Sequence, residues 1–194
     1  MQANATEPLP LDHHNRSEPR TQVSTGTNHP ASTSDDAHTA EGLLDARQLF
    51  LAVAGHMEGG SPLIGWAREL SDLHATLLTA SVSATRRPRD FDSAATRNQI
   101  HTLIGRIDEW AILHLPRPTA ARRHTHSLGE VISHVAHTYA HAHSTLRHSS
   151  SAEHLHDAAL RLAQIQEGYA DLVDEIRALR IELPSGYRGP QTLS

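Results

Sequence analysis

The sequence predicts an all-α protein, a single antiparallel bundle of about five helices that occupies residues 41–184. Apolar residues recur there at the three- and four-residue spacing of amphipathic helices, and no segment alternates apolar and polar residues as a half-buried strand does. Prolines, glycines and capping residues separate the periodic segments. The short connections between them favour antiparallel neighbours, and therefore a bundle without a sheet.

Glycines separate the first two expected helices. Residues 43–54 carry leucine, phenylalanine and alanine at helical spacing, and three glycines within residues 55–60 end that helix. Ser61 and Pro62 then provide an N-cap followed by proline at the first helical position, which is typical of a helix start. We expect the second helix to run to about Thr85.

Capping residues also mark the third and fourth helices. The third is expected to begin at Asp92 or Ser93 and to end before a pair of prolines, because proline cannot continue a helix. Ser127 and Glu130 have the spacing of a capping box, so the fourth helix is expected to begin there and to end near His148.

One long helix is expected to close the bundle. Ser150 and Glu153 repeat the capping-box spacing, and apolar residues follow in helical register for about 30 residues. The apolar positions of the fourth and fifth helices, Leu146, Leu162 and Leu179 among them, are expected to face the core. Pro184 stops this helix.

The two ends of the chain lack apolar periodicity. Residues 1–40 are mainly polar and cannot bury enough apolar surface to offset the entropy of ordering, so we predict a disordered N-terminal tail. Residues 185–194 are expected to form a flexible C-terminal tail. Residues 1–20 lack the apolar stretch of a secretory signal, and no apolar run is long enough to cross a membrane. We therefore expect a cytoplasmic protein.

The composition excludes several kinds of chemistry. The chain has no Cys, and all 17 of its basic residues are Arg, so thiol, disulfide, iron–sulfur and lysine-based mechanisms are absent. The formal net charge of −5 gives no overall attraction to nucleic acid. No familiar catalytic motif occurs. His74 and His101 lie beside apolar positions and are expected to be hydrogen-bonded residues at the edge of the core. We therefore expect a non-enzymatic interaction or accessory protein that binds another protein or a second copy of itself.

Histidines concentrate in the last third of the bundle, where residues 124–156 contain nine of the 17. On a regular helix, Glu130, His134, His137 and His141 share one outward face. His137 and His141 also have the spacing that lets two imidazoles reach one ion, so binding of zinc or another divalent metal is an alternative function. A solvated polar face and a pH-sensitive or partner-facing surface remain open as interpretations.

Basic residues precede the fourth helix. Arg117, Arg122, Arg123, His124 and Thr125 lie just before its start, where free backbone N–H groups and the helix dipole favour anions. A second alternative is therefore an enzyme or binding protein for a small anionic ligand at this loop. The other interpretation of these residues, which we prefer, is a structural loop that hydrogen-bonds to the ends of helices.

Short motifs along the bundle resemble a known bacterial family. In chain order they are Ser61-Pro62-Leu63, Ala67-Arg68-Glu69-Leu70, Leu73-His74, Arg106-Ile107-Asp108 with Trp110, His124-Thr125 with Ser127-Leu128-Gly129, Glu167-Gly168-Tyr169 with Asp171-Leu172-Val173, and Leu183-Pro184. Together they are similar to an actinobacterial branch of the family called domain of unknown function 4254, over about residues 42–184. The resemblance implies a helical fold and a bacterial origin, and it implies no activity.

Overall fold

The computed structural model describes residues 42–82 and 91–184, which belong to one compact unit. The two tails predicted for residues 1–40 and 185–194 lie outside the described residues.

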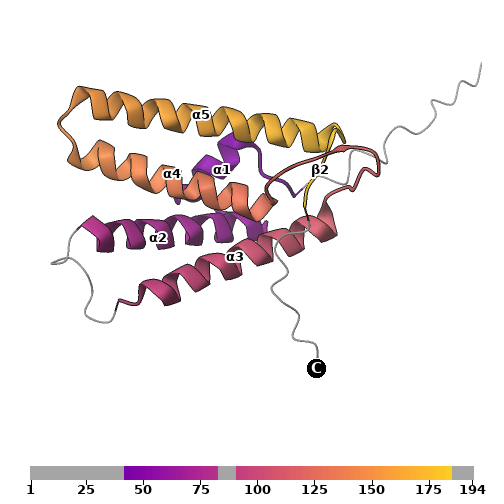
Figure 1. The fold of residues 1–194 in the computed structure, drawn as a ribbon, viewed down its shortest axis with the longest axis horizontal. Coiled ribbons are helices and arrows are strands. Elements are labelled where there is room, and N and C mark those ends of the chain that lie inside the picture. Colours follow the sequence, from indigo (N-terminus) through magenta and orange to yellow (C-terminus); the bar gives the residue numbers. More distant parts are fainter. Residues whose placement is uncertain (1–41, 83–90, 185–194) are drawn as a thin grey trace, which may run out of the picture. The chain divides into compact units, whose positions relative to one another are not determined.

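Five helices form the described part of the chain, and they confirm the predicted antiparallel bundle (Figure 1). Helix α4 occupies its centre, where it packs against α2, α3 and α5, while α1 packs against α2 and α5. None of the helices within the described residues is long and apolar enough to cross a membrane. The helices are α1 (Ala46–Val53), α2 (Pro62–Val82), α3 (Ser93–His114), α4 (Leu128–His148) and α5 (Ala152–Arg177).

The expected caps of α3 and α4 are present. The Asp92 side chain accepts hydrogen bonds from two backbone N–H groups in the first turn of α3. At α4, the Ser127 hydroxyl accepts from the Glu130 N–H at 3.2 Å, and the Glu130 carboxylate accepts from the Ser127 N–H at 2.8 Å. Helix α1 begins at Ala46, three residues later than expected, because an Asp45–Gln48 capping box starts it there.

The prediction for the fifth helix is wrong at both ends. Ser151, not Ser150, caps α5, and the helix ends at Arg177. Leu179 has a φ of 56°, in the left-handed region that breaks a helix. The chain then forms strand β2 (Ile181–Glu182), which pairs in parallel with strand β1 (Arg122–Arg123). The expectation of no sheet therefore fails at this short pair.

The core lies among α1, α2, α3, α4 and the second half of α5. Tyr169 of α5 lies within the core and is only 1% exposed. Its hydroxyl donates to the Leu44 carbonyl oxygen at 3.0 Å. The first half of α5 contributes only Ala158 to the buried residues. Three expected core positions are therefore wrong: Leu146 and Leu179 are 48% and 45% exposed, and Leu162 is only partly buried.

Candidate functional site

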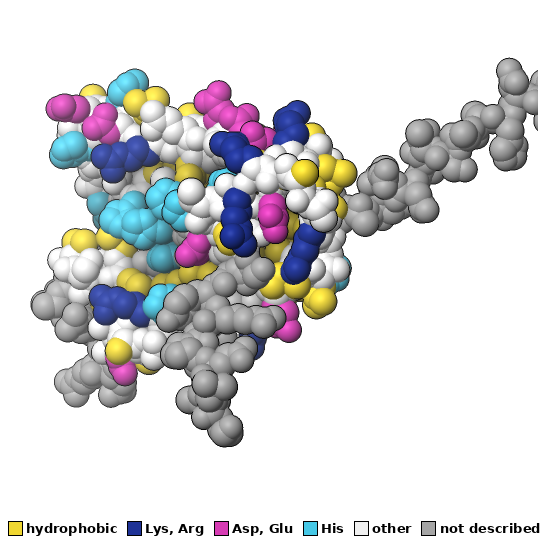
Figure 2. Space-filling model, turned by 45° about the vertical axis from the view of Figure 1, so that its right-hand side comes forward, with side chains coloured by type: hydrophobic (Ala, Val, Ile, Leu, Met, Phe, Trp, Pro, Cys, Tyr) yellow, Lys and Arg dark blue, Asp and Glu magenta, His cyan; other side chains and the backbone are white. Residues whose placement is uncertain are grey.

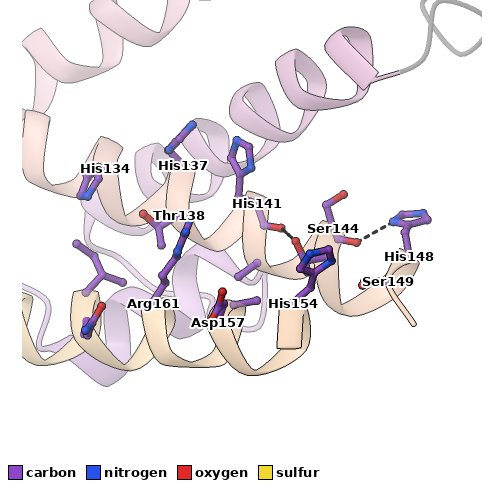
Figure 3. A pocket seen from close by; sticks show the side chains of 15 residues that line it. His134, His137, Thr138, His141, Ser144, His148, Ser149, His154, Asp157 and Arg161 are labelled. Atoms are coloured by element: carbon purple, nitrogen blue, oxygen red, sulfur yellow. Dashed lines mark hydrogen bonds between the residues drawn. The ribbon is translucent and has the colours of Figure 1, made fainter. Parts of the chain in front are cut away.

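A groove of about 850 Å³ runs between α4 and α5 at the end where a short turn joins the two helices (Figure 3). We call it the histidine groove, because five imidazoles line it together with one guanidinium, one carboxylate and several hydroxyls. Its polar lining comprises His134, His137, Thr138, His141, Ser144, Thr145, His148, Ser149, His154, Asp157, Arg161 and Gln164.

Small residues form the floor of the groove. Ala142 of α4 and Ala158 of α5 line it and are only 4% and 7% exposed. Ile165 is the third apolar residue of the lining. Long polar side chains one turn away on each helix surround this floor.

Two charged side chains of α5 enter the groove, and neither forms an ion pair with another described residue. Arg161 extends from α5 toward α4 beside Thr138 (Figure 3), and Asp157 lies one turn earlier on the same helix. Across residues 42–82 and 91–184, the ion pair formed is that between Arg122 and Glu175. The guanidinium of Arg161 is therefore a permanent positive charge that forms no ion pair with a carboxylate of the described chain.

A chain of imidazoles connects the groove to α2. The ring centroids of His137 and His141 are 4.6 Å apart, and those of His74 and His137 are 5.2 Å apart. The Nε2 atom of His74 lies 3.0 Å from the hydroxyl of Ser133, a buried residue. This bond confirms the prediction for His74, whereas His101 is exposed.

Partial burial favours the neutral form of two imidazoles of the cluster, those of His74 and His137. It lowers the pKa of His74 to about 4, and repulsion from His137, His141 and His134 adds to this effect. Burial also lowers the pKa of His137, again with repulsion from His141 and His134. At neutral pH these rings are therefore uncharged, and acidification adds positive charge to a cluster that no carboxylate of α2 or α4 compensates.

His137 and His141 also line a second hollow, of about 330 Å³, on the other side of α4. His74 and Leu77 of α2 and Arg97 of α3 form other parts of its wall. Figure 2 shows the histidine side chains gathered in a depression of the surface, with basic side chains on both sides of it. The cluster is thus accessible from the groove and from this second hollow.

The four residues predicted to bind a metal do not converge on one ion. Glu130 is engaged in the capping box of α4, while His134, His137 and His141 lie along the exposed side of that helix. Within the described part of the chain, no group of three or more His, Cys, Asp or Glu side chains is arranged to hold a metal ion. The structure brings together only the pair formed by His137 and His141.

The basic loop before α4 is divided between two places. Arg122, Arg123, His124 and Thr125 line a hollow of about 280 Å³, which Asp171 and Glu175 of α5 share. The Arg122 guanidinium donates to the Glu175 carboxylate at 3.2 Å. Arg117 lies in a different, mainly apolar hollow beside Leu115 and Pro116. Glu175 therefore pairs with one of the three arginines that the sequence places at this loop.

Sequence reasoning missed the contribution of α5 to the site. His154 and Arg161 are seven residues apart, a spacing that puts them on one helix face. That signal was present in the sequence, but it did not show that this face lies opposite the histidines of α4. Only the packing of the helical hairpin reveals it.

Comparisons of the chain with family models, with curated proteins and with solved structures find no match. The resemblance to domain of unknown function 4254 therefore stays a prediction. The geometry of the groove is the basis for assigning a function.

Proposed function

We propose that the protein is a non-enzymatic binding protein that holds a small anionic ligand in the histidine groove. The observation that carries this proposal is the Arg161 guanidinium, which forms no ion pair within the described residues and extends from α5 into a groove lined mainly by imidazoles and hydroxyls. Charge-assisted hydrogen bonds from a guanidinium to a carboxylate or phosphate are among the strongest that proteins make.

The atoms available in the groove favour an anion over a neutral ligand. The Nδ1–H of His148 donates to the Ser144 carbonyl oxygen at 2.8 Å, so its Nε2 atom is left for a ligand. That atom donates a hydrogen bond only when the ring is protonated. An acidic ligand and a proton therefore support each other's binding at this position.

Anion binding in the groove is expected to take up protons. The charged and titratable groups that face the cluster are His74 from α2, Arg97 from α3, His134, His137, His141 and His148 from α4, and His154, Asp157 and Arg161 from α5. Burial and mutual repulsion lower the pKa of His137 in the free protein, and an anion raises it again. Affinity should therefore increase as the pH falls from about 7.5 to 5.5.

Sulfate is a suitable probe, because its own charge is constant over this pH range. We expect isothermal titration calorimetry to show sulfate binding that strengthens toward pH 5.5. Arg161→Gln should weaken it about tenfold, in line with the loss of a charge-assisted bond. Arg106→Gln, on an exposed position of α3 outside the groove, is the matched control. Equal affinities of Arg161→Gln and the unmodified protein would refute the proposal.

The ring pair of His137 and His141 favours a second candidate function, the binding of a divalent metal such as zinc. Two imidazoles at i and i+4, with centroids 4.6 Å apart, can share one ion. Zinc ligation competes with protonation of the imidazoles, so zinc affinity should decrease below about pH 6. This pH dependence is opposite to the one expected for anion affinity. Zinc titration of the protein and of His141→Ala, which should bind at least tenfold more weakly, tests this candidate.

A further inference from the structure

We infer that the ligand of the histidine groove is an elongated molecule with an anionic group at each end and an uncharged, apolar middle, as in a straight-chain dicarboxylate. This inference rests on the proposed function and names the class of ligand. It follows from the order in which charged and apolar side chains occur along the groove.

Groups that can hydrogen-bond an anion occupy both ends of the groove, a guanidinium at one and a pair of imidazoles at the other. Arg161, the Thr138 hydroxyl and His134 lie at the end away from the turn between α4 and α5. His148 and His154 lie at the end beside that turn (Figure 3). Seven residues separate His154 from Arg161 on α5, which corresponds to about 10.5 Å along a helix axis. A single carboxylate or phosphate group cannot contact both ends.

The middle of the groove disfavours a third charge. Ala142 and Ala158, which are 4% and 7% exposed, form the floor there and offer no hydrogen-bonding side chain to a charged group. Asp157 lies on α5 between His154 and Arg161, and its carboxylate repels an anion placed between the two ends. A continuous polyanion, such as a polyphosphate or a nucleic-acid backbone, therefore fits less well than a ligand charged only at its ends.

A series of dicarboxylates of increasing length tests whether the two ends of the groove bind the two ends of one ligand. Calorimetry of the full chain at pH 6 with succinate, adipate, suberate and sebacate should show tightest binding at suberate or sebacate, whose length suits the separation of the two ends. Octanoate has the length of suberate and only one carboxylate. We expect it to bind about tenfold more weakly than suberate, because the second contact within one complex adds to the first.

Variants at the two ends separate this inference from the proposed function. His154→Gln should reduce suberate affinity to that of octanoate and remove the dependence on length. His156→Gln, exposed on α5 and outside the groove lining, is the control and should behave like the unmodified protein.

The possible outcomes are distinct. If suberate and octanoate bind equally well while sulfate binding depends on Arg161, the inference is wrong and the proposed function stands. If neither sulfate nor suberate binds, both are wrong. If triphosphate binds more tightly than suberate, the ligand is a polyanion and the inference is wrong. Asp157→Asn should raise triphosphate affinity, because it removes the repulsion in the middle.

Discussion

At the residue scale, His74 links the bundle to the pH of its surroundings. Its ring lies between α2 and α4, hydrogen-bonded to Ser133 and edge-on to His137. Its pKa of about 4 in the folded chain is below the ordinary value of 6.5 that it has when unfolded. As the pH falls from 6.5 toward 4, the unfolded chain therefore binds a proton that the folded chain resists, and the fold loses stability.

We expect the free energy of unfolding to decrease by about 1–2 kcal/mol between pH 7 and pH 4.5 because of His74, after allowance for the solvent-exposed part of its ring. His74→Gln keeps a hydrogen-bonding side chain without the titration and should reduce this decrease. Urea unfolding at a series of pH values measures it. His101→Gln, at an exposed position of α3, should leave the pH profile unchanged.

At the element scale, the approach of α4 to α3 depends on one glycine. A Cβ atom at Gly129 would clash with the Ile104 carbonyl oxygen and lie 2.9 Å from the Asp108 carboxylate. That carboxylate is buried and accepts from the Gly129 N–H at 2.7 Å, so it stabilises the first turn of α4. Burial raises the pKa of Asp108, while its bonds to the helix start oppose this change.

Substitution at this contact should separate packing from helix propensity. Gly129→Ala is expected to destabilise the protein by about 1–3 kcal/mol, because backbone must move to admit the methyl group. Gly105→Ala, in α3 with open space around it, should instead stabilise by up to about 1 kcal/mol. Chemical denaturation of both variants measures the difference, and similar effects would contradict the close approach.

The half of α5 beside the histidine groove should contribute less to stability than the core does. Leu160, in the half beside the histidine groove, is 48% exposed, whereas Leu103 of α3 is 2% exposed within the core. Leu103→Ala should cost about 2–5 kcal/mol through lost burial and cavity formation, and Leu160→Ala less than about 1 kcal/mol. Thermal unfolding of the two variants checks this, and equal losses would mean that α5 packs differently.

At the scale of the whole bundle, Tyr169 connects the beginning of the described chain to its last helix. Its hydroxyl donates to the Leu44 carbonyl oxygen just before α1, in a fully buried position. Burial raises the pKa of Tyr169 far above its ordinary value, so the hydroxyl remains a donor at every physiological pH.

Removal of this hydroxyl leaves the Leu44 carbonyl oxygen without its buried donor. Tyr169→Phe is therefore expected to cost about 1–2 kcal/mol of stability. Hydrogen exchange should show the loss in α1 as well as in α5. Tyr139→Phe, at a partly buried position of α4, is the control and should change stability by less than about 0.5 kcal/mol.

Local sequence determined which segments are helical. Caps such as Asp92 and Ser127 act through their own side chains on the next turn, so neighbouring residues are enough to predict them.

Tertiary contacts decided what local pattern could not. Strand β2 forms because residues 122–123 lie beside it, and these are far away in the sequence. The groove lies between α4 and α5, and both helices contribute residues to its lining. The sequence alone therefore identified the histidines of α4, and only the packing of α5 against that helix placed Arg161 among them, because helical periodicity defines a face without defining what lies opposite it.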